Sequence, residues 1–191
     1  MAAKSTLGNM VLCLFGVCLV CSAILGAIYV VTLEPISQAA EKALKTSIGQ
    51  VLPEGGEISD AVKSDGFEYY TCTVNGEKVA YAVKSTAIGF GGPLTLMVGV
   101  LADGTVYNTS VLSHSETPGL GAKCTSDEGF IAQWKGFTGK LAVKKDGGDV
   151  DAITASTITS RAYTLAVANA VEFVKSLGNV ETETMEGTEN E

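Results

Sequence analysis

The chain has 191 residues, with 13 lysines and arginines against 21 aspartates and glutamates, which gives a net charge of −8. This balance argues against nucleic acid as a partner, because phosphate binding needs a basic surface. Hydrophobic residues make up 46% of the chain and charged residues 18%, which excludes a disordered polypeptide. The single histidine excludes a multi-histidine metal site, and we expect no metal centre. The sequence therefore predicts an acidic protein whose chemistry does not depend on histidine.

An apolar run near the N-terminus predicts a membrane anchor. No charged residue occurs over Ser5–Leu33, and Val11–Val31 is interrupted only by two glycines and one serine. At about 1.5 Å per residue, such a helix spans the ~30 Å hydrocarbon core of a bilayer. It is longer than the apolar region of a signal peptide, about 7–15 residues, so we expect residues 1–33 to remain as a single-pass anchor in the cell (inner) membrane. Lys4 precedes the run, which predicts a cytoplasmic N-terminus and a following domain on the periplasmic, extracytoplasmic side.

Hydrophobic spacing predicts an α+β domain over residues 34–180. Apolar residues at three-and-four spacing after Pro35 indicate an amphipathic helix. Two strand pairs follow, and the Asn-Gly and Asp-Gly turns within them favour hairpins. The predicted elements are a helix over 35–52, strands over 69–74 and 78–83, strands over 94–101 and 106–112, a short capped helix over 126–134, a strand over 141–145, a strand-like segment over 150–153, and a helix over 156–177 ended by Gly178. Hairpins with helices at the ends predict an antiparallel sheet covered by helices.

The remaining features of the chain are a tail and five cysteines. The last eleven residues hold five glutamates and no cation, so residues 181–191 are predicted to form an acidic disordered tail. Cys13, Cys18 and Cys21 lie inside the apolar run, where small packing residues are expected. The sequence leaves open whether Cys72 and Cys124 form a disulfide, because it does not show their proximity.

Two loop segments are candidates for a binding site. Gly89–Pro93 has three glycines in its first four positions, which lets the backbone approach a ligand closely. His114–Gly121 places an acid, hydroxyls, the single histidine and two glycines in one loop after a strand. Functional residues concentrate in such loops, yet a structural turn explains either segment equally well.

A third candidate is Thr154–Ser160, which has five hydroxyl residues in seven positions at the start of the predicted C-terminal helix. One serine or threonine is enough to cap a helix. The unpaired N–H groups and the positive dipole end of a helix N-terminus also bind phosphate well. A helix cap and a phosphate site both remain open for this segment.

The segment Asp151–Ser160 resembles the flavinylation motif of the FMN-binding domain family, whose final motif threonine carries FMN through a phosphoester. That threonine corresponds to Thr157. Gly89–Pro93 and Ser113–Gly121 resemble the GFGGP and SHSETPGLG segments of the same family. This chain departs from the commoner Gly-Ala of the motif with Ala155-Ser156, which are also small. Together with the N-terminal anchor, the resemblance covers the whole chain except for the acidic tail. In this respect the chain is similar to the G subunits of Rnf-type complexes.

The resemblance implies an FMN site whose residues come from all three segments. It implies covalent FMN on Thr157, with Thr154 and Ser156 beside it in the motif. It further implies that Glu116 and Thr117 contact the isoalloxazine ring, that Leu120 packs against the face of the ring, and that Lys140 neutralises a flavin or phosphate charge. No protein acid or nucleophile is expected to act catalytically, because the flavin is the redox centre.

The function implied by the resemblance is electron transfer within a membrane-bound Rnf-type complex that couples ferredoxin and NAD redox chemistry to Na⁺ or H⁺ translocation. The implied partners are the other membrane subunits and a flavin transferase for maturation, and no independent catalysis is expected. Three alternatives remain: the FMN subunit of a sodium-pumping NADH:quinone reductase, an anchored flavin domain that serves an extracellular reductase, and a non-redox anchored module whose hydroxyl cluster only caps a helix.

Overall fold

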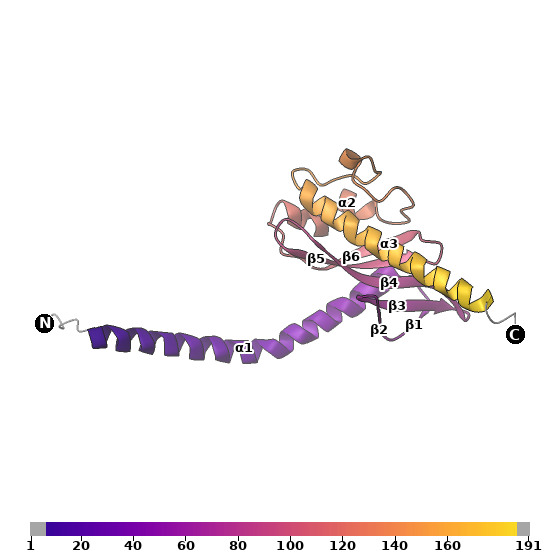
Figure 1. Ribbon diagram of the computed structural model, residues 1–191. Coiled ribbons are helices and arrows are strands. Elements are labelled where there is room, and N and C mark those ends of the chain that lie inside the picture. Colours follow the sequence, from indigo (N-terminus) through magenta and orange to yellow (C-terminus); the bar gives the residue numbers. More distant parts are fainter. Residues whose placement is uncertain (1–6, 187–191) are drawn as a thin grey trace. The chain divides into compact units, whose positions relative to one another are not determined.

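The computed structural model describes the backbone of residues 7–186 and the side chains of residues 7–178. It begins with the long helix α1 (Leu7–Val51), drawn in indigo to purple in Figure 1. The chain packs as two units, Met1–Ala43 and Leu44–Glu191, so the last residues of α1 belong to the second unit.

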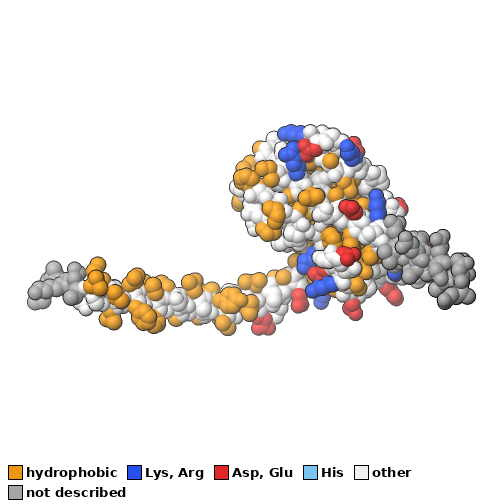
Figure 2. Space-filling model, viewed as in Figure 1, with side chains coloured by type: hydrophobic (Ala, Val, Ile, Leu, Met, Phe, Trp, Pro, Cys, Tyr) orange, Lys and Arg blue, Asp and Glu red, His pale blue; other side chains and the backbone are white. Residues whose placement is uncertain are grey.

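The first unit carries a candidate membrane span. Among the described residues, α1 is the one helix that is long and apolar enough to cross a membrane, with a mean hydropathy of 2.7 in its most apolar window. Its large side chains are exposed, as expected for a surface that faces lipid. Figure 2 shows hydrophobic side chains over the whole N-terminal stretch of this helix, without charged ones among them. The apolar helix of the predicted anchor is thus confirmed, whereas Lys4 lies outside the described residues.

Pro35 lies inside α1, and the predicted separate helix that begins at Pro35 is wrong. A proline lacks the N–H that would bond to the carbonyl four residues earlier, but its φ is compatible with a helix. The hydroxyls of Thr32 and Ser37 donate to the carbonyls of Ile28 and Glu34, each at 2.8 Å, on the two sides of the proline. No glycine or second proline occurs over residues 27–48, so the helix continues to Val51.

The second unit is built on a six-stranded antiparallel sheet (Figure 1). The strands are β1 (Glu57–Ile58), β2 (Val62–Ser64), β3 (Phe67–Val74), β4 (Glu77–Ile88), β5 (Pro93–Leu101) and β6 (Val106–Ser113). Their order is β1-β3-β4-β5-β6, with β2 also paired to β3. The predicted hairpins are confirmed as β3–β4 and β5–β6. Strands β1 and β2 were not predicted, because two or three largely exposed residues show no hydrophobic alternation.

Both faces of the sheet are covered. Successive residues of a strand point to opposite faces. On one face, Leu96 and Val98 of β5 pack against helix α3 (Thr157–Glu186), and on the other Met97 packs against Val51 at the end of α1. Gly99 lies on the α1 face, where a side chain would collide with the Val51 carbonyl. This antiparallel sheet between helices confirms the predicted α+β fold.

Predicted elements between the sheet and α3 also differ from the structure. Helix α2 covers only Glu128–Ala132, capped by the Asp127 carboxylate, which accepts from the Phe130 N–H at 3.0 Å. The predicted strands over 141–145 and 150–153 are wrong: a single parallel bridge joins Val143 to Val150, and Lys144–Asp146 form the short 3₁₀ helix η2. Gly147 and Gly148 lie in the turn between the two segments, and only one residue pair is left to form a bridge, so no strand ladder develops.

Helix α3 continues past Gly178, so the predicted end of the helix there is wrong. A glycine inside a helix costs only about 1 kcal/mol relative to alanine, which neighbouring helix formers offset. The backbone is helical through Glu186, into the predicted acidic tail, and residues 187–191 of that tail lie outside the described part of the chain.

The two cysteines of the folded unit are free thiols. Cys72 is buried in the cluster beneath α1, and Cys124 is buried in the cluster beneath α3. Because the sheet separates these two clusters, the fold does not bring the two thiols together.

Candidate functional site

The three candidate segments of the sequence meet at one cavity. Its volume is about 330 Å³. It is lined by Phe90 from the loop before β5, by Glu116, Thr117, Leu120 and Gly121 from the loop after β6, and by Ala155, Ser156, Thr157, Ile158 and Thr159 at the start of α3. The β4–β5–β6 ladder brings the first two loops to one end of the sheet, and α3 begins at the same end.

The start of α3 presents unpaired backbone N–H groups to this cavity. The first hydrogen bond of the helix runs from the Ser160 N–H to the Ser156 carbonyl, at 3.0 Å. The N–H groups of residues 157–159 precede that bond and carry the positive end of the helix dipole. The Ser160 hydroxyl accepts from the Ile153 N–H at 2.9 Å, which holds the preceding turn in place.

Ala155 adopts a left-handed conformation in this turn, with φ of 62°. A non-glycine residue pays a steric cost of about 1–2 kcal/mol there. This explains why glycine is the commoner residue at the position in the motif that the sequence resembles. The turn into α3 thus places Ala155 in the left-handed region, where its small side chain keeps the steric cost low.

Ser156 supplies an unsatisfied polar group at the cavity wall. Its side chain is only 7% exposed. Among the described residues, its hydroxyl oxygen has no hydrogen-bond partner. Buried hydroxyls nearly always have a partner. This oxygen is itself buried, so it lies behind the cavity wall and does not reach into the cavity.

Thr157 is half-buried, and its hydroxyl faces a cation. The Lys145 ammonium donates to the Thr157 hydroxyl oxygen at 3.4 Å. Lys145 comes from η2, which packs beside the first turn of α3 through the Arg161–Asp146 ion pair at 2.7 Å. Three features thus meet at the start of α3: the Thr157 hydroxyl, the N–H groups of residues 157–159, and the positive charge of Lys145.

Glu116 joins the three segments from behind the cavity. One carboxylate oxygen accepts from the Thr159 hydroxyl at 2.8 Å, and the other accepts from the Gly91 N–H at 3.3 Å. Gly89 and Gly121 lie so close that a side chain on either would collide with this carboxylate. The charge of Glu116, second to burial, raises the pKa of the Cys124 thiol to about 11. His114 completes the loop by accepting from the Glu116 N–H at 3.2 Å.

Apolar side chains form the outer rim of the cavity. Phe90 is 71% exposed, Ile158 51% and Leu120 46%. Apolar side chains around a cavity are typical of a small-molecule site. The cavity therefore has a polar, cationic end at Thr157 and an apolar rim.

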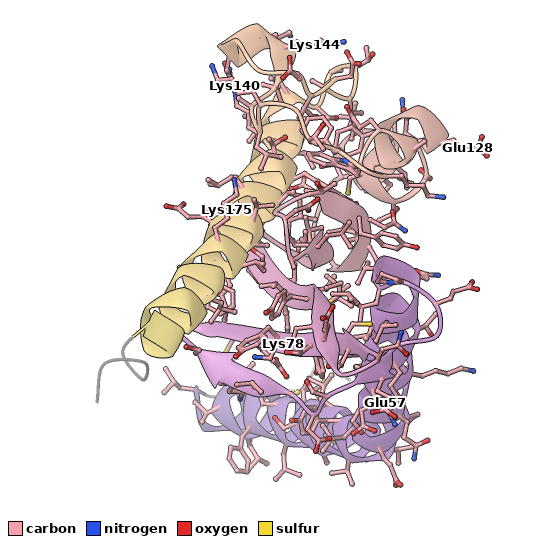
Figure 3. The ribbon with its side chains drawn as sticks, turned by 90° about the vertical axis from the view of Figure 1, so that its right-hand side faces the viewer. Glu57, Lys78, Glu128, Lys140, Lys144 and Lys175 are labelled. Carbon is pink, nitrogen blue, oxygen red and sulfur yellow. The ribbon has the colours of Figure 1, made fainter. Side chains whose placement is uncertain are left out.

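The structure brings together most of the predicted site residues. Glu116, Thr117, Leu120, Ser156 and Thr157 line the cavity. Thr154 is exposed and does not line it. Lys140 does not line it either, and its N–H donates to the Asp149 carboxylate at 2.6 Å. Figure 3 shows Lys140 and Lys144 at the end of the domain where α3 begins.

The contributors to the site that were not predicted individually from the sequence include Phe90, Ile158, Thr159 and Lys145. Thr159 and Ile158 follow Thr157 directly, and helical spacing would have placed Thr159 on the buried face of α3 beside Ser156. Lys145 gave no signal, because it is one of several lysines before the motif and its approach to Thr157 depends on the path of the loop.

Comparison with known proteins places the chain among flavin-binding and ion-translocating proteins. The model of the FMN-binding domain family matches residues 89–172. The G subunit of the ion-translocating oxidoreductase complex of Vibrio vulnificus is 38% identical over 168 residues, covering 76% of this chain and 78% of the relative. The G subunit of the proton-translocating ferredoxin:NAD(+) oxidoreductase complex of Clostridium ljungdahlii is 33% identical over 161 residues, covering 82% and 85%.

Solved structures with a similar fold include a second group of proteins. The C subunit of the Na(+)-translocating NADH-quinone reductase of Parabacteroides distasonis is 24% identical, with a TM-score of 0.47, over 59% of this chain and 73% of that one. The NqrC protein of Shewanella oneidensis is 20% identical, with a TM-score of 0.43, over 57% and 61%.

Proposed function

Because this chain belongs to the family of the G subunits of ion-translocating oxidoreductase complexes, we propose that it is the membrane-anchored, FMN-carrying electron-transfer subunit of an Rnf-type complex. Such a complex couples electron transfer between ferredoxin and NAD to Na⁺ or H⁺ translocation. The chain is then one subunit of an oxidoreductase, with the other membrane subunits as its partners. The observation that carries this function is the cavity at the start of α3, which joins an anion site to an apolar rim.

The residues at the cavity fit an FMN group. A phosphate at the start of α3 would be held by the N–H groups of residues 157–159. The Phe90, Leu120 and Ile158 side chains offer apolar surface to an isoalloxazine ring. The cavity volume of about 330 Å³ is within the range of small-molecule sites.

The protein's own contribution is to hold and shield the cofactor. When bound, FMN supplies reversible electron transfer, which no side chain of the site provides. Glu116 ties Gly91 of one loop to Thr159 of α3 and so keeps the cavity walls in register. The apolar rim lowers access of water to the ring. The membrane helix keeps the domain next to its partner subunits.

Covalent attachment belongs to the same proposal, with Thr157 as the residue that bears the phosphoester. A noncovalent cofactor would escape from a cavity that opens to an extracytoplasmic space, and an ester prevents that loss. The Thr157 hydroxyl lines the cavity at the first position of α3, where the helix dipole favours an anion. A flavin transferase would form the ester during maturation from an activated flavin dinucleotide. The Thr157 oxygen would bond to the FMN phosphorus as the phosphoanhydride bond of the donor breaks, with the second nucleotide leaving and the hydroxyl proton passing to solvent.

The decisive experiment is flavin fluorescence of the full chain in a denaturing gel after co-expression with a flavin transferase. We expect a fluorescent band in the wild-type chain that Thr157→Ala abolishes. The matched control is Thr154→Ala, which removes an exposed hydroxyl of the same segment outside the cavity. A band that survives in Thr157→Ala, or that disappears only in Thr159→Ala, would contradict the assignment.

The same proposal puts the folded domain on the periplasmic side. A membrane-impermeant thiol reagent can test this on a chain whose native cysteines are replaced and which carries Glu128→Cys, an exposed position on α2 (Figure 3). We expect labelling in intact cells or spheroplasts. Labelling only after the membrane has been opened would place the domain in the cytoplasm instead.

A further inference from the structure

Three cations lie close to the first turn of α3, and two of them are already paired. The Lys144 ammonium is 2.7 Å from the Asp151 carboxylate. The Arg161 guanidinium binds both oxygens of the Asp146 carboxylate, each at 2.7 Å. These two pairs satisfy their charges and at the same time fasten η2 against α3 and against the turn before it.

Lys145 is the third cation, and it is differently placed. Its ammonium donates to the Thr157 hydroxyl, and within residues 7–178 no carboxylate lies at ion-pair distance from it. The charge is therefore directed at the side chain that opens α3.

We propose that Lys145, and not Lys140, is the residue that binds the phosphate of the ester on Thr157; this inference rests on the proposed function. The two lysines differ in their contacts. The Lys145 ammonium donates to the Thr157 oxygen that would become part of the ester, whereas among the described residues no hydrogen bond joins the Lys140 side chain to that oxygen. An ammonium beside a phosphodiester anion forms a charge-assisted hydrogen bond, the stronger kind in proteins.

The surrounding charges favour this pairing. On its own element, Lys145 has Asp146 as a neighbour, and the Arg161 pair from α3 neutralises that carboxylate. On the adjoining turn, Asp151 is neutralised by Lys144. From α3 itself, the N–H groups of residues 157–159 face the same point. A phosphodiester on Thr157 would thus lie beside the N-terminus of α3 and the Lys145 ammonium, which is unpaired among the described residues. The two neighbouring carboxylates, Asp146 and Asp151, are each paired with another cation.

The test is ³¹P NMR of the flavin-loaded full chain in detergent at a fixed pH of about 8. A phosphodiester keeps one fixed negative charge at this pH, so a change in its ³¹P shift reports a neighbouring group. We expect the signal to move in Lys145→Gln, which removes the cation beside the Thr157 oxygen, and to stay at the wild-type position in Lys144→Gln and Lys140→Gln.

Lys145→Arg keeps the positive charge and guards against a variant that folds or loads poorly. Its ³¹P signal should stay closer to the wild-type position than that of Lys145→Gln. A flavin-loaded chain whose signal is unchanged in Lys145→Gln, or moves only in Lys140→Gln, would overturn the role of Lys145 alone. A wild-type chain with no flavin on Thr157 would instead contradict the proposed function.

Discussion

The two ends of the cavity are built on opposite principles. At one end, Glu116 is 6% exposed, and its carboxylate accepts hydrogen bonds of 2.8 Å and 3.3 Å from two other segments. At the other end, Thr157 is half-buried, and its side chain takes part in a 3.4 Å hydrogen bond from an exposed lysine. The first end is a closed network of the protein with itself. At the second end, the N–H groups of residues 157–159 remain available to bind a ligand.

This difference separates stability from function. A buried network holds loops in position, and its loss is costly because it leaves buried partners unsatisfied. A helix start with free N–H groups contributes little to folding, yet it offers the groups that bind an anion. Changes at Glu116 should therefore act mainly on folding, and changes at Thr157 mainly on the cofactor.

The largest effect is expected for Glu116→Ala. The Thr159 hydroxyl, 1% exposed, and the Gly91 N–H would lose a charged acceptor, so the free energy of unfolding should fall by about 2–3 kcal/mol. Trp134 is the single tryptophan and is fully buried, so its fluorescence reports the transition in urea.

The matched change at the other end is Thr157→Ala in the chain made without flavin. It should alter the free energy of unfolding by no more than about 0.5 kcal/mol, as expected for a partly exposed position. Equal losses in the two variants would show that the ends do not differ in the way proposed.

The second largest effect concerns alkaline pH. Burial, and then the charge of Glu116, raise the pKa of the Cys124 thiol to about 11 from an ordinary value of 9.0. Because the folded pKa is raised, this contribution to stability is complete below pH 9 and is lost as the pH rises through 11. The loss should reach about 2 kcal/mol and should be smaller in Cys124→Ala and in Glu116→Gln.

Cys72 is the control for this alkaline effect. Burial also raises the pKa of the Cys72 thiol, but no charged group contributes to that shift. Glu116→Gln should therefore leave the Cys72 contribution intact. Urea unfolding of the full-length variants at about pH 8 and pH 10.5 gives the comparison, since these values lie below and within the range of the shift. An alkaline loss that is unchanged in Cys124→Ala would refute the assignment.

A smaller effect is expected for Leu120→Ala on the apolar rim. Leu120 is 46% exposed, so without flavin its truncation should cost little. In the loaded chain it should remove about 1 kcal/mol of packing against the ring, and the attached flavin should become more accessible to iodide quenching. Leu165→Ala is the control, since Leu165 is also exposed but does not line the cavity.

The smallest effect lies beside Thr157. The hydrogen bond from Arg161, together with its charge and that of Lys145, holds the pKa of the Asp146 carboxyl below its usual value. Because the folded pKa is lowered, the pair is present above the usual value and is lost as the pH falls through the lowered one. Carboxyl NMR should show the Asp146 pKa return upward in Arg161→Gln. An unchanged titration would mean that the pair does not fasten η2.

Several elements could be predicted from the sequence because their signals lie in adjacent residues. The apolar run over Val11–Val31 satisfies the length of a membrane span by itself. The Asn75-Gly76 and Asp103-Gly104 turns specify their hairpins locally, and the hydroxyl-rich segment before Ile158 marks the start of α3. Where local signals were weak, as in the short bridge at Val143, the expected strand did not form.

The site depended more on tertiary structure. The sequence by itself determined that three unusual segments exist, and the resemblance of Asp151–Ser160 to a flavinylation motif pointed to Thr157. It did not determine that Gly91, Glu116 and Thr159 share one buried network, because these contacts depend on strand register and on the packing of α3.

The clearest case is the choice between two lysines. Nothing in the local sequence distinguishes Lys145 from Lys140 as a partner of Thr157. The tertiary structure decides it, because the Arg161–Asp146 pair and the Val143–Val150 bridge fold the loop so that Lys145 faces the first residue of α3. Local propensity is set by neighbours in sequence, whereas the position of a charge in space is set by contacts between residues that are far apart along the chain.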